Sequence, residues 1–275
     1  MWLIRGKYYN LSGFKSIHPG GSILLDACEG EDATAAFESY HAMSNMNKIN
    51  SIMSKYEIDC PKNEADKIDS VPLKFVENEF YDTARRRVRD YFKATQKSHR
   101  ANIFWVVKSF CQFLLFVMSF LFTCFATNYS MYIRSLTAVF SGHMLIQYGF
   151  GVMHDASHHA ISSNPKVNEW LSRMWTSIAL WDNSIWYKHH CFMHHAYTGS
   201  EHDPDVIHYY PLIRKSPAEN GSRYIGKISG TFSSMLFLLN VFPGMWFGQS
   251  LAYIKGLCQG FMWRFKLPRR SDVGE

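Results

Sequence analysis

Apolar residues gather in the second part of the chain, in three long runs. The first two cover residues 103–126 and 132–153, and the short polar break "TNYSM" separates them. The third covers residues 230–254 and carries a Pro-Gly pair near its middle. A helix that crosses the hydrocarbon core of a bilayer needs ~20 mostly apolar residues. The pattern therefore predicts membrane-spanning helices over all three runs, with the first two forming a hairpin that returns the chain to the side it left.

The region before these runs is more polar than the rest of the chain. Residues 1–58 predict a compact domain that contains the turn sequence "HPGG". Residues 59–78 are charged, contain two prolines and show little apolar periodicity, which is typical of a linker. Residues 79–97 place apolar side chains on one side of a helix and arginines on another. Such an amphipathic helix is expected to lie in the membrane interface.

The formal net charge is +6. The positions of the basic residues indicate how the chain is oriented in the membrane and do not indicate a nucleic-acid partner. The basic residues do not gather on an element that reads nucleic acid, so that class of partner is excluded. Their densest cluster, "RRRVR", directly precedes the first apolar run, and such clusters usually mark the cytoplasmic side of a span. The six cysteines form no C-x-x-C pair and indicate reduced thiols. Basic residues also follow the third run, and a single crossing would place them on the luminal side, against this tendency. That run therefore either re-enters the membrane or is followed by further spans.

Two groups of histidines repeat the spacing H-x-x-x-H-H. One lies in "GVMHDASHHAI", residues 151–161, directly after the second apolar run, and the other lies in "YKHHCFMHHAYTG", residues 187–199. Residues 165–186 between them are rich in tryptophan and polar residues, which favours an interfacial segment over a crossing. Both groups are therefore expected on one face of the membrane. The first histidine set is His154, His158 and His159, and the second histidine set is His190, His194 and His195.

The spacing within each set suits metal ligation. Residues four apart share a helix face, so His154 and His158 can converge on one ion, as can His190 and His194. The last histidine of each set lies further around the helix and is placed to reach a second ion. Neutral imidazole suits zinc, copper, iron and nickel, but six histidines exceed one tetrahedral zinc site, which favours two redox metals. Asp155 is expected either to accept a hydrogen bond from a ligand histidine or to be a polar helix-end residue.

Two sequence motifs resemble known families. "HDASHH" and "WYKHHCFMHHAYTGSEHDPDV", with the apolar hairpin before them, resemble the membrane fatty-acid desaturases, including the trailing "DPD". "WLIRGKYYNLSGFKSIHPGG" and "GEDATAAFESYH" resemble cytochrome b5. The resemblance implies that His18 and His41 are the two axial ligands of a b-type haem, and that the histidine sets hold two non-haem iron ions. A haem with two histidine ligands has no open iron position and carries electrons.

The fusion of the two parts resembles the front-end fatty-acid desaturases, and also an insect cytochrome b5-related protein. It implies a small α+β cytochrome b5-like haem domain over residues 1–58, followed by an all-α, multi-span membrane domain of the desaturase type over residues 79–275. The expected reaction is oxygen-dependent desaturation of a fatty acyl chain, held as a lipid or as acyl-CoA, in polyunsaturated fatty acid biosynthesis. Cytochrome b5 reductase is the expected electron donor. The expected location is the endoplasmic reticulum membrane, with the haem domain and both histidine sets in the cytosol.

Two departures from the family pattern define the alternatives. The family has a strand and a helix before the position of Met1, and a third histidine box, Q-x-x-H-H, that is not found up to Glu275. The haem domain is therefore expected to be incomplete at its N-terminus and the membrane domain at its C-terminus, and this chain alone is expected to be inactive. A sphingoid-base desaturase or a lipid hydroxylase is an alternative with the same metal chemistry. A membrane-anchored electron-transfer protein with an incomplete, silent iron site is an alternative of another class.

Overall fold

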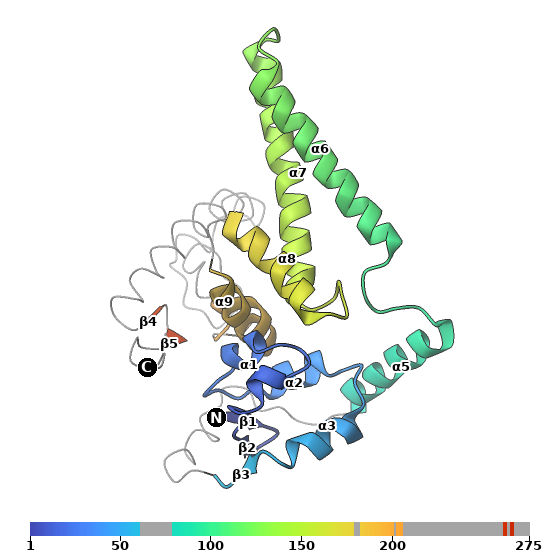
Figure 1. The fold of residues 1–275 in the computed structure, drawn as a ribbon, viewed down its shortest axis with the longest axis vertical. Coiled ribbons are helices and arrows are strands. Elements are labelled where there is room, and N and C mark those ends of the chain that lie inside the picture. Colours follow the sequence, from blue (N-terminus) through green and yellow to red (C-terminus); the bar gives the residue numbers. More distant parts are fainter. Residues whose placement is uncertain (61–78, 179–181, 201, 206–260, 263–264, 267–275) are drawn as a thin grey trace, which may run out of the picture. The chain divides into compact units, whose positions relative to one another are not determined.

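The computed structural model describes residues 1–60, 79–178, 182–200, 202–205, 261–262 and 265–266 (Figure 1). The chain divides into two compact units, Met1–Thr176 and Ser177–Glu275, which are described separately. Most of the predicted linker and the predicted third span lie outside the described residues.

The first unit begins with a three-stranded antiparallel sheet in the order β1-β2-β3. Its strands are β1 (Trp2–Ile4), β2 (Lys7–Tyr9) and β3 (Glu57–Ile58). The hairpin between β1 and β2 turns at Arg5 and Gly6, which both have positive φ, 53° and 74°. Two positive φ values are what a tight turn needs to match the twist of its flanking strands.

Short helices complete this small α+β domain. They are η1 (Lys15–Ile17), α1 (Ile23–Ala27), α2 (Thr34–Tyr40) and α3 (Met46–Met53). The side chain of Asn45 caps α3 by accepting hydrogen bonds from the backbone N–H groups of its first turn. The core that holds sheet and helices together includes Trp2, Leu3, Ile4, Tyr8, Leu11, Ile23, Leu24 and Phe37, all buried. The architecture is the α+β domain that the sequence predicts.

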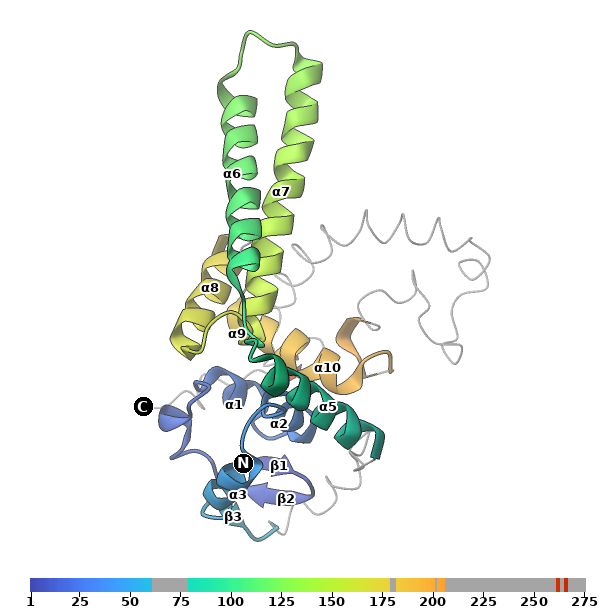
Figure 2. The ribbon, with the colours of Figure 1, turned by 90° about the vertical axis from the view of Figure 1, so that its right-hand side faces the viewer.

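Three long helices follow in the same unit. Helix α5 (Glu79–Thr95) covers most of the predicted amphipathic segment. Helices α6 (Ile103–Phe125) and α7 (Met131–Ser157) lie antiparallel and side by side (Figures 1 and 2). The Arg134 guanidinium near the start of α7 donates to the Thr123 carbonyl from Nε and Nη2, at 3.1 and 3.0 Å, and so closes the hairpin.

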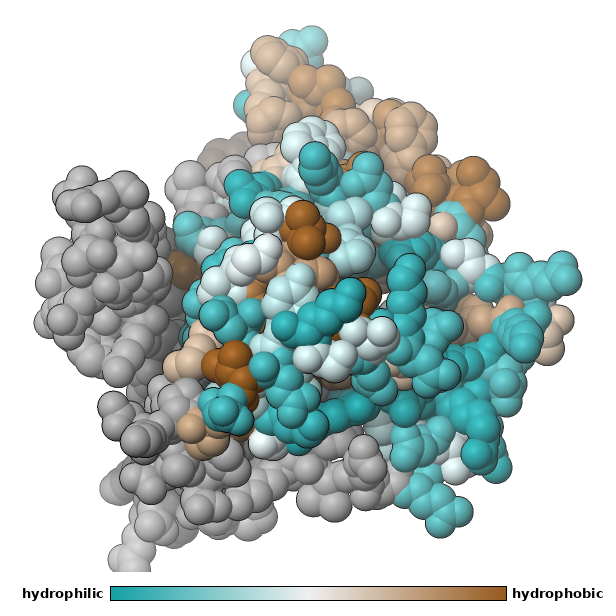
Figure 3. Space-filling model, turned by 60° about the horizontal axis from the view of Figure 1, so that its bottom comes forward, coloured by the Kyte–Doolittle hydropathy of each residue, from teal (hydrophilic) through white to brown (hydrophobic). Residues whose placement is uncertain are grey.

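Among the described residues, α6 is the one helix long and apolar enough to cross a membrane. Its side chains, including Phe104, Phe110 and Met118, are mostly exposed. Hydrophobic residues gather on the hairpin, whereas the α+β-domain side of the unit is largely hydrophilic (Figure 3). Exposed apolar surface of this size marks a membrane or protein contact. The prediction of several spans goes beyond this finding and stays a prediction.

Helix α8 (Pro165–Ile178) packs against α7 at Gly149. A Cβ atom at Gly149 would lie 2.2 Å from the Trp175 ring, so the close approach requires glycine. In the second unit, α9 (Asn183–Trp186) continues into the π-helix η2 (Tyr187–His194) and then into α10 (His195–Tyr197). Strands β4 (Phe261–Met262) and β5 (Phe265–Lys266) form an antiparallel pair.

Candidate functional site

His18 and His41, here called the haem pair, face each other in the α+β domain. His18 follows η1 and His41 follows α2, and their ring centroids are 6.2 Å apart with the ring planes at 76°. His18 Nδ1 lies 2.8 Å from the Gly21 carbonyl, and His41 Nδ1 lies 2.8 Å from the Phe37 carbonyl. A carbonyl only accepts, so both Nδ1 atoms carry the proton. Each Nε2 is therefore left with the lone pair that a metal needs.

The surroundings of the haem pair fit a b-type haem. Burial lowers the pKa of both imidazoles, although the hydrogen bonds to the carbonyls oppose this effect. Both rings are therefore neutral near pH 7, which is the ligating form. A Cβ atom at Gly20 would lie 2.9 Å from Cε1 of His18, so the "HPGG" turn leaves this space to the ring. The fold thus brings together two histidines that are far apart in sequence, as the cytochrome b5 resemblance implies.

The first histidine set lies where α7 ends. His154 belongs to the last turn, His158 is the residue that caps the helix, and their ring centroids are 4.7 Å apart. This pair follows the predicted i, i+4 geometry. His159 has left the helix with φ 55°, so its ring direction is not set by helical spacing as predicted. The ring lies instead beside Tyr40, with the centroids 6.1 Å apart.

The backbone explains this departure. The N–H of His159 donates to the Ala156 carbonyl at 2.9 Å, and the N–H of Ala160 donates to the Asp155 carbonyl at 3.0 Å. These two bonds form a Schellman motif, in which glycine normally occupies the left-handed position. A left-handed residue other than glycine costs roughly 1–2 kcal/mol and is common at functional sites. The backbone of His159 is therefore strained, at a position where the sequence predicts a metal ligand.

Neighbouring side chains orient the first histidine set. Asp155 Oδ1 lies 3.2 Å from His154 Nδ1, and Asp155 Oδ2 accepts a hydrogen bond from Trp105 Nε1 at 2.8 Å. Arg100 donates to the carbonyl of His159 at 2.7 Å. Burial, reinforced by the positive charge of Arg100, lowers the pKa of His159 to about 4. Asp155 thus orients the His154 ring through its Nδ1 atom, and His159 is neutral near pH 7.

Tyr40 joins this set to the α+β domain and was not predicted as a site residue. Its hydroxyl donates to the Ser157 carbonyl at 3.1 Å and lies 3.4 Å from Nδ1 of His158. The Tyr40 and His158 rings are nearly parallel, with the centroids 6.3 Å apart. Tyr40 directly precedes His41. Of these two adjacent residues, His41 belongs to the haem pair and Tyr40 contacts the first histidine set.

The second histidine set lies on the π-helix η2 and the residue after it. The ring centroid of His190 lies 5.4 Å from that of His194 and 4.7 Å from that of His195. The prediction of an α-helix set His195 apart from the other two. A π-helix bonds residue i to i+5, so it widens the turn and brings all three rings onto one face. Short π segments are frequent at functional sites.

Carboxylates behind the second set were not predicted as site residues. His194 Nδ1 lies 3.0 Å from Asp203 Oδ1 and 3.3 Å from Asp205 Oδ2. Asp203 is 1% exposed, and its Oδ2 also accepts the Gly199 N–H at 2.7 Å. His189 Nε2 lies 2.9 Å from Asp205 Oδ1. The "DPD" sequence was a signal for the two carboxylates. No spacing pattern in the sequence distinguishes His189 from the histidines near it.

Atoms of His194, Asp203 and Asp205 lie within 4.8 Å of one another, because both carboxylates contact His194 Nδ1. The donor set of both histidine sets, imidazole nitrogens with carboxylates behind them, suits non-haem iron. The arrangement defines a class of protein: a haem-type domain joined to a membrane-associated, histidine-rich metal site.

Comparison with known proteins identifies the families. The sequence matches the fatty acid desaturase family over residues 132–271 and the cytochrome b5-like heme/steroid binding domain over residues 1–61. The chain therefore belongs to the fatty acid desaturase family and begins with a cytochrome b5-like domain. The resemblance stated from the sequence is confirmed. Membership of these families implies a haem and two non-haem iron ions as cofactors and association with a membrane.

Several curated relatives are desaturases. The chain is 31% identical to the probable Delta(5) fatty acid desaturase C of Dictyostelium discoideum, over 75% of this chain and 44% of the relative. It is 31% identical to the acyl-lipid (8-3)-desaturase B of the same organism, over 75% of this chain and 43% of the relative. It is 28% identical to the acyl-lipid (8-3)-desaturase of Mortierella alpina, over 77% of this chain and 46% of the relative. The chain thus spans less than half the length of these relatives. No solved structure matches it.

Proposed function

We propose that this chain is part of a front-end desaturase that introduces a double bond into a fatty acyl chain and uses molecular oxygen. The relatives are named Delta(5) and acyl-lipid desaturases, which favours a lipid-bound acyl substrate over acyl-CoA. His18 and His41 hold the haem. The two irons are held by His154, His158, His159, His190, His194 and His195. Asp155 is oriented toward Nδ1 of His154, and Asp203 toward Nδ1 of His194.

The contact of Tyr40 with the first histidine set carries this proposal. It lies within one compact unit and joins the residue beside His41 to the carbonyl of Ser157 at 3.1 Å. An electron carrier that serves a metal centre has to dock near it, and Tyr40 makes this contact inside the chain. A membrane-anchored electron carrier with a silent iron site has no need for such a contact.

When bound, the haem supplies one-electron transfer and the irons supply oxygen activation for removing hydrogen from adjacent methylenes. The chain's own residues prepare the site for this chemistry. The Gly21 and Phe37 carbonyls fix the tautomers of the haem pair, while Asp155 and Asp203 fix those of His154 and His194. Carboxylates behind ligand histidines make the imidazoles more basic and hold their orientation.

The proposed location is the endoplasmic reticulum membrane, with cytochrome b5 reductase as the electron donor from the cytosol. The hairpin of α6 and α7 starts and ends on one side if both helices cross, so the haem domain and the first histidine set share a face. The interfacial character of residues 165–186 extends this face to the second set. Cysteine-accessibility mapping at Ser162 and Ser200 tests the topology. Labelling of these two positions from opposite sides would refute it.

The reaction is tested by expressing in yeast a chain extended to the length of the relatives and profiling its lipids. A polyunsaturated product that depends on supplied acyl substrate supports the proposal. His158→Ala and His194→Ala should abolish the product, whereas His99→Ala, outside both sets, should keep it. Protein abundance is measured alongside because a lost ligand also destabilises a metal-dependent fold. A desaturated or hydroxylated sphingoid base as the product would favour the alternative substrate class.

A further inference from the structure

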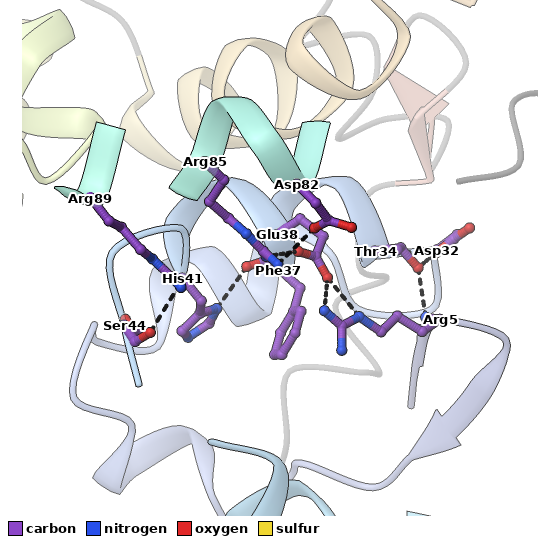
Figure 4. Close-up of polar contacts among 10 residues, drawn as sticks. All are labelled: Arg5, Asp32, Thr34, Phe37, Glu38, His41, Ser44, Asp82, Arg85 and Arg89. Atoms are coloured by element: carbon purple, nitrogen blue, oxygen red, sulfur yellow. Dashed lines mark hydrogen bonds and ion pairs between the residues drawn. The ribbon is translucent and has the colours of Figure 1, made fainter. Parts of the chain in front are cut away.

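Helix α5 contacts the haem domain through a buried carboxylate. The side chain of Glu38 on α2 is 4% exposed. Its carboxylate accepts a hydrogen bond from Arg5 Nε at 2.6 Å and another from Arg85 Nη1 on α5 at 2.8 Å (Figure 4). Arg85 is itself held by Asp82, at 3.0 Å from Nη2. The Glu38 carboxylate is buried and shared by two arginines, and its bond to Arg85 joins α2 to α5.

A second arginine, one turn further along α5, binds the backbone that follows His41. Arg89 Nε donates to the Ala42 carbonyl at 2.6 Å. Arg89 Nη2 donates to the Ser44 carbonyl at 3.1 Å (Figure 4). The two contacts therefore lie on either side of His41 in sequence, at Glu38 and at Ala42–Ser44. Hydrogen bonds from a charged donor are stronger than those from a neutral donor.

The pattern of α5 assigns these arginines to one face. Arg85 and Arg89 are four apart and share a side of the helix. Phe80 and Tyr91 lie on the opposite side, where Arg87 also lies, and are exposed, at 85% and 53%. The face of α5 that carries Arg85 and Arg89 is therefore the one that contacts the haem domain. The sequence analysis interpreted the "RRRVR" cluster as an orientation signal. Two of its arginines, Arg85 and Arg89, bind the haem domain.

We infer that Glu38, Arg85 and Arg89 form a dock that fixes the haem domain on α5 and thereby holds Tyr40 against the first histidine set. The partner of this surface of α5 is the chain's own haem domain. The haem domain is positioned by the dock in addition to its covalent connection. The inference rests on the proposed function only for the purpose of the dock, because its contacts are independent of any reaction.

Amide hydrogen exchange on the full chain tests the dock. Arg85→Ala/Arg89→Ala should speed exchange of the amides between residues 36 and 45 by about tenfold or more, since the lost bonds are charge-assisted. Arg87→Ala removes the same charge from an exposed position of the same helix and should leave exchange unchanged. An unchanged haem absorption spectrum shows that the domain remains folded. Equal exchange in the double variant and in Arg87→Ala would overturn the inference.

A milder variant keeps the test decisive if the double variant does not fold. Arg89→Ala leaves Glu38 paired with both of its arginines and should still speed exchange between residues 41 and 45. Arg89→Lys should restore part of the protection because an ammonium can reach one carbonyl. Failure of the proposed function is distinguishable: a chain that makes no desaturated product but shows this exchange pattern retains the dock. Protection that does not depend on Arg89 would contradict it.

Discussion

The haem pair and the two histidine sets are oriented by different kinds of hydrogen-bond acceptor. His18 and His41 each donate Nδ1–H to a backbone carbonyl that lies three or four residues away in sequence. His154 and His194 lie against carboxylates, Asp155 and Asp203. A carbonyl is neutral and is fixed by the local turn, whereas a carboxylate is charged and makes the imidazole a stronger donor to a metal. The haem pair is thus held by local backbone, whereas His154 and His194 are held by side chains, so the two sites respond differently to mutation.

The largest expected effect is loss of the haem. His41→Ala removes one of two axial nitrogens and leaves the iron with a single histidine, so the low-spin haem spectrum should disappear. Visible absorption of the purified full chain measures this. Tyr40→Phe, at the neighbouring position, serves as the control and should retain the spectrum. A low-spin spectrum that survives His41→Ala would remove His41 from the haem pair and end the comparison.

A substitution that exchanges only the acceptor distinguishes the two kinds of site. Asp203→Asn keeps the volume of a side chain that accepts both His194 Nδ1–H and the Gly199 N–H. An amide has one acceptor oxygen, so one of these donors faces an NH₂ group. Iron affinity should fall by about 10–100-fold, as is typical when the partner of a ligand histidine is changed.

The matched control is Asp182→Asn. Asp182 caps α9 through one oxygen, and asparagine is an equally good N-cap, so iron affinity should not change. Iron binding is measured by titration of the apoprotein in a chain extended to the length of the relatives. Equal affinities of the Asp203→Asn and Asp182→Asn variants would show that the carboxylate is not part of the metal site.

Much of the fold was predictable because it depends on local patterns. The amphipathic segment forms α5, the first apolar run forms α6, and the second forms α7, which extends four residues past its predicted end at residue 153. The haem pair was predictable because its turn and its flanking residues form a motif. These features are set within a few turns of chain, where periodicity and turn residues are informative.

Several features of the candidate site had no local signal. The pairing of Tyr40 with Ser157 and of Glu38 with Arg85 joins residues that are 117 and 47 apart in sequence. The π-helix η2 requires i→i+5 bonds that no periodicity of "YKHHCFMH" indicates. His159 occupies a left-handed position where a sequence rule expects glycine. In each case tertiary packing decides the outcome against local preference.

A smaller effect tests the backbone side of the comparison. Gly20→Ala places a Cβ 2.9 Å from the His18 ring, which is held by the Gly21 carbonyl and has to shift. Crowding of this kind costs about 1–3 kcal/mol, so haem affinity should fall by roughly tenfold or more. Gly13→Ala is the control because a Cβ there has no neighbour within 4 Å. Haem transfer to apomyoglobin measures both variants. Equal transfer rates would show that the turn does not set the position of the His18 ring.

The smallest effect is expected where the two kinds of site meet. Tyr40→Phe keeps the aromatic ring beside His158 and removes the hydroxyl that donates to the Ser157 carbonyl. One neutral hydrogen bond contributes about 0.5–1.5 kcal/mol, so a chain extended to the length of the relatives should lose several-fold in desaturation rate at most. The haem spectrum and the iron content should stay the same, because neither ligand set is changed. Tyr40→Ala removes the ring as well and should have the larger effect on rate. A loss of iron with Tyr40→Phe would mean that the hydroxyl holds His158 in place as strongly as a carboxylate does, and the distinction between the two kinds of acceptor would then have to include Tyr40 among the side chains of the metal site.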